Sequence, residues 1–109
     1  MMLENGQANG RQVVPQSWVA DSRFNGDTAA WAAGEGAAAN PHGSYRNKWW
    51  IMGDGHSAYT GIGVFGQYLW IDPVASLVIA KFASEPLPTD DNVSLDTARC
   101  FQAIGLALA

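Results

Sequence analysis

The sequence contains a single cysteine, Cys100, so the chain forms no internal disulfide, and the apolar neighbours of Cys100 predict a small core residue. Basic residues are also few, with six Lys and Arg against ten Asp and Glu. They form no basic stripe, which excludes a nucleic-acid-binding surface. No apolar run reaches about 18 residues, which excludes a transmembrane helix. The start MMLENGQ lacks the basic and apolar regions of a signal peptide, which favours the cytoplasm without fixing the compartment.

The 109 residues leave room for one small domain, and 48% of them are apolar. Alanine and glycine supply much of that fraction, especially over 29–39, and they bury little area. The five tryptophans are many for this length, and each brings a large apolar face with one N–H donor. We therefore expect the chain to need a partner surface to bury its rings.

The first part of the chain is punctuated by turn signals. Met1–Leu3 is typical of the last turn of a helix, and Gly6 suits a left-handed cap after it. The cap residues that would start such a helix are absent, so the chain is expected to open in mid-element. Asn9-Gly10 predicts a tight turn, and Pro15 suits the start of a short helix. These signals predict a helix-turn-helix segment over 1–24, followed by a long loop over 25–44.

Strand patterns occupy 45–83. Residues 45–52 are rich in strand formers, and Asp54-Gly55 predicts a hairpin turn. A second strand covers roughly 58–64, and 67–72 either continues it or begins a third. The run SLVIAKFA at 76–83 is nearly all apolar, which is typical of a strand covered on both faces.

The last segment, 92–109, is predicted to be a helix capped by Asn92 or Ser94. Its apolar positions repeat at helical spacing on one face: Ala98, Phe101, Ile104 or Gly105, and Leu108. The predicted fold is α+β, with three antiparallel strands and the C-terminal helix packed on them. One helix leaves one face of such a sheet bare, so self-association is expected.

The sequence matches two nucleotide-binding motifs only in part. Gly61, Gly63 and Gly66 spell G-x-G-x-x-G, yet a strand rather than a helix follows, so the dinucleotide fingerprint fails. A glycine-rich hairpin followed by Lys81 in VIAK imitates a protein kinase. The helix after that strand offers no glutamate to pair with Lys81, since Glu85 precedes the helix, and no catalytic loop follows.

No catalytic set is complete within the chain. No serine is followed three residues later by lysine, and Ser57 is expected to be a hairpin residue. The Y-x-N triplet beginning at Tyr45 is interpreted as coincidence. His42 and His56 are isolated, so no metal site is predicted. The side chains of Trp49 and Trp50 alternate across a strand, so one ring faces inward, where it either packs in the core or lines a pocket.

Taken together, these segments resemble the class C β-lactamase-like serine hydrolases. The first 22 residues are similar to a pattern L-x-x-G-x-x-N-G-x-x-V-[VL]-P-x-x-W-[VI] of that family. YRNKWWIM, then G-x-x-G-Q-x-[LI]-x-[IV]-D-P and an apolar strand ending in lysine, is most similar to the 6-aminohexanoate-oligomer hydrolase branch. The resemblance covers nearly the whole chain and is weakest over 25–43.

The resemblance implies a C-terminal fragment, 1–109, of a single β-lactamase/transpeptidase-like domain whose serine, lysine and tyrosine lie upstream. This chain then has no catalytic residue, needs no cofactor and is inactive alone. The motif strand beside the nucleophile aligns in two ways, with either Tyr59-Thr60-Gly61 or Gly63-Val64-Phe65 in the place of Lys-Thr-Gly. The second is preferred because it keeps Gly66-Gln67 and Asp72-Pro73 in register, although Phe65 replaces the histidine of that branch.

With that alignment, the resemblance implies an oxyanion-hole N–H at Val64 and a substrate pocket formed by Trp50, Gly63, Phe65 and Tyr59. The expected partners are a small amide or ester substrate and the N-terminal remainder of the same domain, with no nucleic acid and no membrane. The missing Lys-Thr-Gly favours an amidase or esterase over a true β-lactamase. The alternative function is a non-enzymatic interaction domain that uses exposed aromatic residues.

Overall fold

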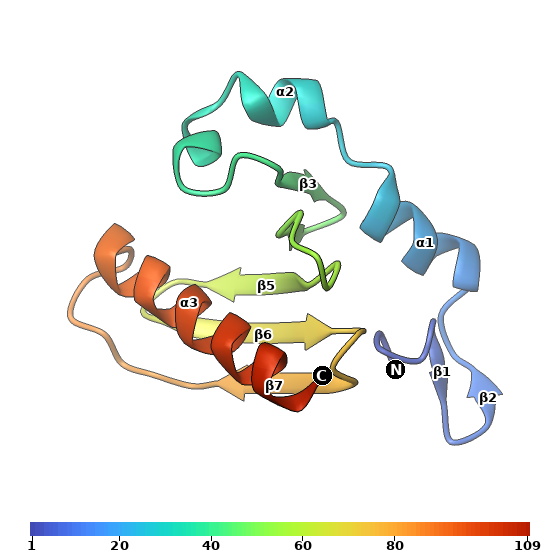
Figure 1. Ribbon diagram of the computed structural model, residues 1–109. Helices are drawn as coiled ribbons and strands as arrows, with labels where there is room; N and C mark the ends of the chain where they lie inside the picture. Colours follow the sequence, from blue (N-terminus) through green and yellow to red (C-terminus); the bar gives the residue numbers. More distant parts are fainter.

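The computed structural model describes residues 1–109 and contains a five-stranded antiparallel sheet crossed by one long helix (Figure 1). The sheet has the order β3-β4-β5-β6-β7, and a separate two-stranded hairpin pairs β1 with β2. The elements are β1 Gln7–Ala8, β2 Arg11–Gln12, α1 Gln16–Phe24, α2 Thr28–Ala32, η1 Glu35–Ala38, β3 Ser44–Arg46, β4 Trp49–Ile51, β5 Tyr59–Gly63, β6 Gln67–Asp72, β7 Leu77–Lys81 and α3 Asp91–Leu108. The predicted α+β class, with an antiparallel sheet and a C-terminal helix, is confirmed.

The sheet has five strands rather than three because 45–52 is a hairpin of two strands, and because 58–64 and 67–72 form two separate strands, β5 and β6. Asn47 and Lys48 both adopt positive φ, of 51° and 73°, which turns the chain tightly between β3 and β4. Lysine has little preference for turns, so the sequence does not predict this one. The predicted turn at Asp54-Gly55 is present within a longer connection, where Asp54 Oδ1 accepts hydrogen bonds from the N–H groups of His56 and Ala58.

The N-terminal predictions are partly wrong. Met1–Leu3 lie in turns rather than in a helix, although Gly6 is left-handed with φ of 89°. The predicted turn at Asn9-Gly10 connects β1 and β2, and the helix expected after Pro15 is α1. The helix-turn-helix segment is therefore a hairpin followed by one helix.

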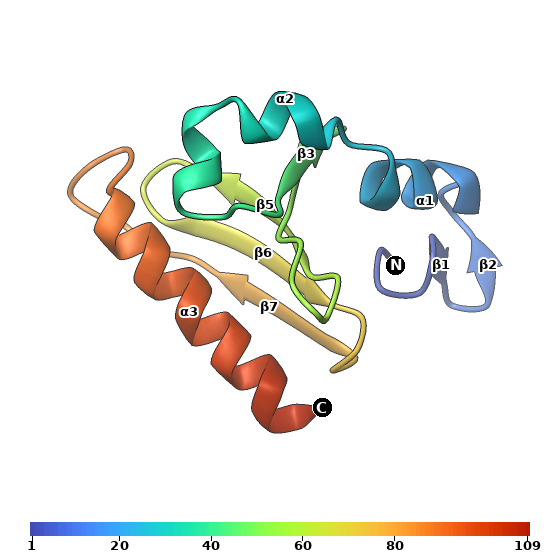
Figure 2. The same ribbon diagram turned by 45° about the horizontal axis from the view of Figure 1, so that its top comes forward.

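The segment 25–44 is more ordered than the predicted loop, because Trp31 organises it. Its indole Nε1 donates to Asn40 O at 2.8 Å, and a Cβ built on Gly36 or Gly43 would overlap the ring. Asp27 caps α2 by accepting from Ala30 N at 2.9 Å. In Figure 2 this lobe of α2 and η1 stands over β3.

The helix α3 begins one residue earlier than predicted, because Asp90 caps it instead of Asn92 or Ser94. The Asp90 carboxylate accepts from the N–H groups of Asn92 and Val93. Thr97, Phe101 and Gly105 are its buried residues, whereas Leu108 is 61% exposed. Cys100 is also exposed, contrary to prediction, because its position lies off the buried stripe.

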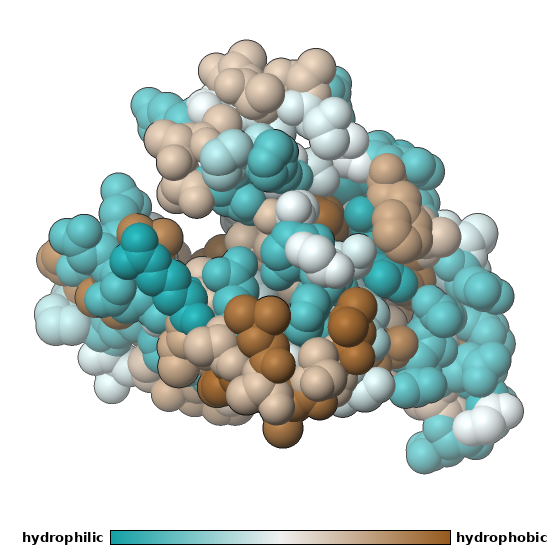
Figure 3. Space-filling view, in the orientation of Figure 1, coloured by the Kyte–Doolittle hydropathy of each residue, from teal (hydrophilic) through white to brown (hydrophobic).

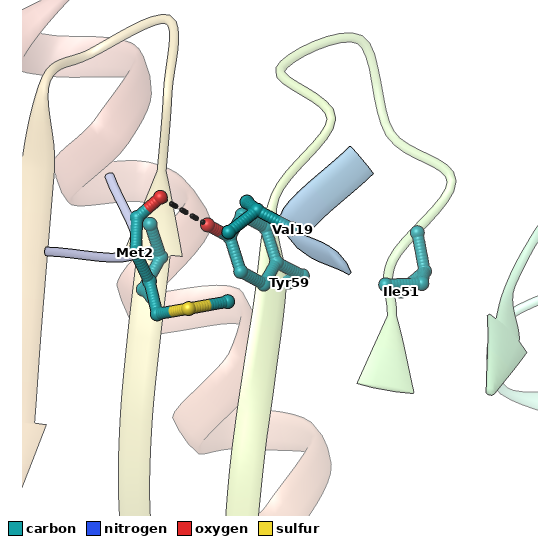
Figure 4. Close-up of a cluster of buried hydrophobic side chains, with 5 residues drawn as sticks. Met2, Val19, Ile51 and Tyr59 are labelled. Atoms are coloured by element: carbon teal, nitrogen blue, oxygen red, sulfur yellow. Dashed lines mark hydrogen bonds between the residues drawn. The ribbon is translucent and has the colours of Figure 1, made fainter. Parts of the chain in front are cut away.

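The two faces of the sheet are packed by different elements. On one face, Phe101 of α3 packs its ring against Tyr68 and Trp70, with centroids 6.0 and 5.6 Å away. Since strand side chains alternate, Leu69 and Ile71 point to the opposite face. There Ile71 joins a second core cluster with Met2, Val19, Ile51 and Tyr59 (Figure 4). None of the helices combines the length and the apolar character that a membrane span requires.

The helix α3 approaches the sheet most closely at a buried carboxylate. Asp72, 1% exposed, pairs with His56 through Nδ1 and Oδ2 at 2.7 Å, and its Oδ1 accepts from Ala75 N. Gly105 lies so close that a Cβ there would overlap Asp72 Oδ2. Glycine is therefore required at this helix position by close approach and not by backbone conformation.

Gly105→Ala should lower the free energy of unfolding by about 1–3 kcal/mol, because α3 must move away from Asp72. The control is Gly55→Ala, where a Cβ meets no atom within 4 Å, and it should change stability little. Urea unfolding followed by tryptophan fluorescence measures both variants. Equal stabilities for the two would contradict the close contact.

The α1 helix is held to β3 by a bidentate ion pair. Arg46 donates to the Asp21 carboxylate at 2.7 and 2.9 Å, and this pairing lowers the pKa of Asp21 from 3.8 to about 2. A carboxyl group whose pKa is lowered in the folded state stabilises the fold at pH values above its pKa in the unfolded chain, which is about 4. That stability is lost as the pH falls through about 2.

Asp21→Asn should therefore flatten the decrease in stability between about pH 4 and pH 2. Urea midpoints measured across that range test this prediction. Glu4→Gln, at an exposed carboxylate, is the control and should keep the wild-type slope. An unchanged slope in Asp21→Asn would show that the ion pair does not contribute.

Candidate functional site

A groove lies between the end of β5 and the first turn of α3. Its volume is about 230 Å³, and the connection from β7 to α3 forms one side. Figure 3 shows the surface hollowed between the N-terminal end of α3 and the lobe of α2 and η1. The lining residues are Trp50, Ile62, Gly63, Val64, Tyr68, Glu85, Pro88, Thr89, Asp90 and Ser94.

The tip of the β5–β6 hairpin, Val64–Gly66, closes one end of the groove. Phe65 and Gly66 both have positive φ, of 60° and 87°. This conformation is strained for phenylalanine, so the surroundings must hold it. Phe65 N donates to Pro88 O at 2.9 Å, and Phe65 O accepts from Glu85 N at 3.2 Å.

Side chains complete this clamp on the hairpin tip. Gln67 Nε2 donates to Phe65 O and to Ala83 O, and Gln67 Oε1 accepts from Ala83 N. The Glu85 side chain lies directly over Gly66, where a Cβ would overlap the carboxylate. The segment that follows β7 therefore fixes the hairpin tip through both backbone and side-chain contacts.

The edge of β5 beside the groove is open. β4 pairs with β5 only through Trp50↔Thr60 and Ile51↔Tyr59, so Gly61–Gly63 have a strand neighbour on the β6 side alone. The N–H of Val64, one residue further, makes no hydrogen bond within the chain. Val64 is 59% exposed and lines the groove, so its N–H is a free donor.

Trp50 forms a fixed wall of the groove. Its ring packs edge-on against Tyr45, its partner on β3, with centroids 4.7 Å apart and planes at 66°. Of the two adjacent tryptophans, Trp49 packs against Tyr59 on the opposite face, at 5.2 Å. Of the two rings, Trp50 lines the groove, and its role in a substrate pocket stays a prediction.

The charged groups of the groove are already paired. Lys81 Nζ donates to Glu85 Oε1 at 2.9 Å and to Thr97 Oγ1 at 3.2 Å, and it lies 5.4 Å from the Tyr68 ring centroid. Asp90 is occupied in capping α3. Glu85 does pair with Lys81, but from the connecting segment and not from a helix, so the kinase arrangement is absent.

Two of the five predicted site residues lie elsewhere. Tyr59 is fully buried in the cluster on the other face of the sheet, where its hydroxyl donates to Met2 O at 3.0 Å and burial raises its pKa. It is excluded from the groove because its side chain packs in that cluster, at the end of β5 away from the hairpin tip. Phe65 is not among the residues that line the groove, although its neighbour Val64 is. Trp50, Gly63 and Val64 do line the groove together.

Sequence reasoning missed the residues that the β7–α3 connection brings to the groove. Glu85, Asp90 and Ser94 lie 20 or more residues after β5, and only the fold places them there. The i,i+4 spacing of Lys81 and Glu85 was the one local signal. No group of three or more His, Cys, Asp or Glu could hold a metal ion, and the His56–Asp72 pair lies under α3.

Comparison with known proteins gives a direct relationship. Over 111 aligned residues the chain is 36% identical to 6-aminohexanoate-dimer hydrolase of Paenarthrobacter ureafaciens, and the alignment covers 95% of the chain. The chain is a relative of this hydrolase. It spans only 28% of that enzyme's length. No family model matches the chain.

A solved structure agrees with this relationship. A Bacillus anthracis protein, provisionally named a 6-aminohexanoate-dimer hydrolase, superposes with a TM-score of 0.77 at 34% identity. The superposition covers 98% of this chain and 26% of that one. The predicted resemblance to the 6-aminohexanoate-oligomer hydrolase branch is thus confirmed.

The clamp on the hairpin tip can be tested with two glycine substitutions. Gly66→Ala should destabilise the chain by at least about 1 kcal/mol more than Gly10→Ala, because both positions are left-handed but only Gly66 is crowded, by Glu85. Thermal unfolding of the two variants measures the difference. Equal losses of stability in the two variants would mean that the Glu85 side chain moves aside freely and does not hold the hairpin tip.

Proposed function

We propose that this chain is the C-terminal portion of a serine hydrolase acting on amides or esters, to whose active site it contributes one wall and one oxyanion-hole donor. The observation that carries the proposal is the N–H of Val64, which has no partner within the chain and lies at the rim of the groove. A donor held ready in this way is what an oxyanion hole requires.

The chemistry assigns a defined task to that donor. When a serine hydroxyl attacks a carbonyl carbon, the carbonyl oxygen becomes an oxyanion until the amine or alcohol leaves. Water then hydrolyses the acyl-enzyme through a second oxyanion. Removal of one hole donor costs about 3 kcal/mol in the transition state. The clamp on Phe65 supports the role, because a donor fixed before reaction needs no reorganisation.

The remaining groove residues shape the binding of the substrate. Gly63 has no side chain, so a substrate carbonyl reaches the strand closely. Trp50, fixed by Tyr45, offers a flat apolar wall for the chain of a small amide or ester. The amide class is favoured by the name of the relative, whose substrate is a 6-aminohexanoate dimer. The chain contains no serine with a lysine three residues later, so the nucleophile must come from the rest of the hydrolase.

An interaction domain is the second candidate, and the observation in its favour is Phe82, which is 88% exposed. Such a domain would fold cooperatively alone and use its exposed aromatic residues to bind another protein. The two functions differ in what the groove does. Only the hydrolase requires the Val64 N–H.

The test places this chain in a chimera, in which it replaces the matching segment of the Paenarthrobacter ureafaciens hydrolase. The isolated chain should not hydrolyse a chromogenic ester, whereas the chimera should. Within the chimera, Val64→Pro removes the N–H and should lower kcat by about 10²–10³.

Val64→Ala is the matched control, because it keeps the N–H and should leave kcat nearly unchanged. Far-ultraviolet circular dichroism confirms that both variants are folded. Equal losses in the two variants would assign the effect to the side chain. Hydrolysis by the isolated chain would contradict the proposal altogether.

A further inference from the structure

Gln67, the first residue of β6, uses its whole side-chain amide on the backbone around the hairpin tip. Its Nε2 donates to Phe65 O at 3.1 Å and also to Ala83 O, and its Oε1 accepts from Ala83 N at 3.3 Å. A glutamine amide offers two N–H donors and one carbonyl oxygen. Both donors and the oxygen are therefore engaged, on two segments that lie 18 residues apart in the sequence.

The three partners of this amide determine both its orientation and its chemistry. Phe65 O and Ala83 O can only accept a hydrogen bond, whereas Ala83 N can only donate one. If the amide were turned over, its oxygen would face two carbonyl oxygens and its NH₂ group would face an N–H. A carboxylate of the same size has no donor, and the amide of asparagine is one methylene shorter. The site therefore requires glutamine rather than any polar side chain of this length.

The Gln67 amide also extends the pairing between β6 and β7. The strand β7 ends at Lys81, two residues before Ala83. Both backbone groups of Ala83 pair with the Gln67 side chain, as they would pair with a peptide group of a neighbouring strand. Gln67 thereby ties Phe65 to the end of β7, in addition to the backbone bonds that Phe65 makes further along the same segment.

The Val64 N–H lies between two residues that Gln67 holds. Gly63 precedes it, pairs with Gln67 across the hairpin and lies against its side chain, since a Cβ on Gly63 would be 3.1 Å from Gln67 Cβ. Phe65 follows it, and its carbonyl oxygen accepts from Gln67 Nε2. Gln67 itself does not line the groove. Its influence on the Val64 donor therefore passes through the backbone and not through a bound substrate.

We infer that Gln67 is a positioning residue for the oxyanion-hole donor, because its amide keeps the Val64 N–H in place at the rim of the groove. The inference rests on the proposed function, since the position of the donor affects the rate only if the donor binds the oxyanion. A hold of this kind is needed because Phe65, with φ of 60°, is strained and would relax if its partners were lost. A displacement of about 1 Å in such a group can cost about 100-fold in rate.

The experiment uses Gln67→Met in the chimera with the Paenarthrobacter ureafaciens hydrolase. Methionine keeps the length of the side chain, adds no charge and removes all three hydrogen bonds. With a chromogenic ester, kcat should fall about 10–100-fold, whereas KM should change less than about threefold. The two constants separate because the oxyanion develops in the transition state and not in the bound substrate.

Gln12→Met is the matched control. Gln12 Nε2 also donates to two backbone carbonyls, Asn5 O at 2.9 Å and Val14 O at 2.6 Å, and none of these residues lines the groove. The variant loses the same kind of double hydrogen bond, yet it should leave kcat and KM unchanged. Thermal unfolding of both variants confirms that the rates are measured on folded protein.

Hydrogen exchange of the Phe65 amide gives a second readout that does not depend on activity. This N–H bonds to Pro88 O, so its exchange rate reports whether the hairpin tip has loosened. The exchange should be at least about tenfold faster in Gln67→Met than in the wild-type chimera, and unchanged in Gln12→Met. Mass spectrometry of a peptide that covers 63–67 measures it.

An unchanged kcat in Gln67→Met would overturn the inference, whether or not the tip exchanges faster. Equal losses of kcat in Gln67→Met and Gln12→Met would also overturn it, because the effect would then be general. If Val64→Pro lowers kcat and Gln67→Met does not, the proposed function stands and the inference alone fails. If Val64→Pro has no effect, or if the wild-type chimera is inactive, the proposed function and the inference fail together.

Discussion

The β5–β6 hairpin is the constraint on which the rest of the structure depends. Its five paired positions decide which side chains face α3 and which face α1. A shift of one residue would exchange the two sets, because the side chains of a strand alternate. Tyr68 and Trp70 would then leave Phe101, and Tyr59 would leave Val19. The hairpin therefore sets both cores and, at its tip, the direction of the Val64 N–H.

The tip is held by groups that serve the fold and the site together. The segment after β7 bonds to both backbone groups of Phe65, and Lys81 fixes the Glu85 carboxylate over Gly66. Asp90 then starts α3 within the same few residues. A strained backbone persists only when its surroundings determine it. These contacts fix the backbone on either side of the Val64 N–H, the donor in the proposed function.

The chain buries little of itself, since 18 of its 109 residues are buried. A small core of this kind gives modest stability, and a sheet with one open apolar half loses further contacts. The chain spans 28% and 26% of the length of the two hydrolases to which it is similar.

The sequence by itself determined the local structure. Strand-forming residues between turn signals marked β5 and β6, and a nearly all-apolar run marked β7. Asn9-Gly10 and Asp54-Gly55 marked turns, and the spacing of Phe101 and Gly105 marked the buried side of α3. These signals depend on residues that are close in the sequence, so they can be recognised without the tertiary structure. The resemblance in motif order also directed attention to Val64 and Trp50, which do share the groove.

Only the tertiary structure decided which groups meet. Asn47-Lys48 became a turn because β3 and β4 pair, and Tyr59 left the predicted pocket because register placed it on the other face. Glu85 and Asp90 reached the groove because the chain returns along the sheet before α3. The N–H of Val64 is unpaired because no strand lies beside it. Such properties depend on which strands pair and where each one stops, and no local pattern records them.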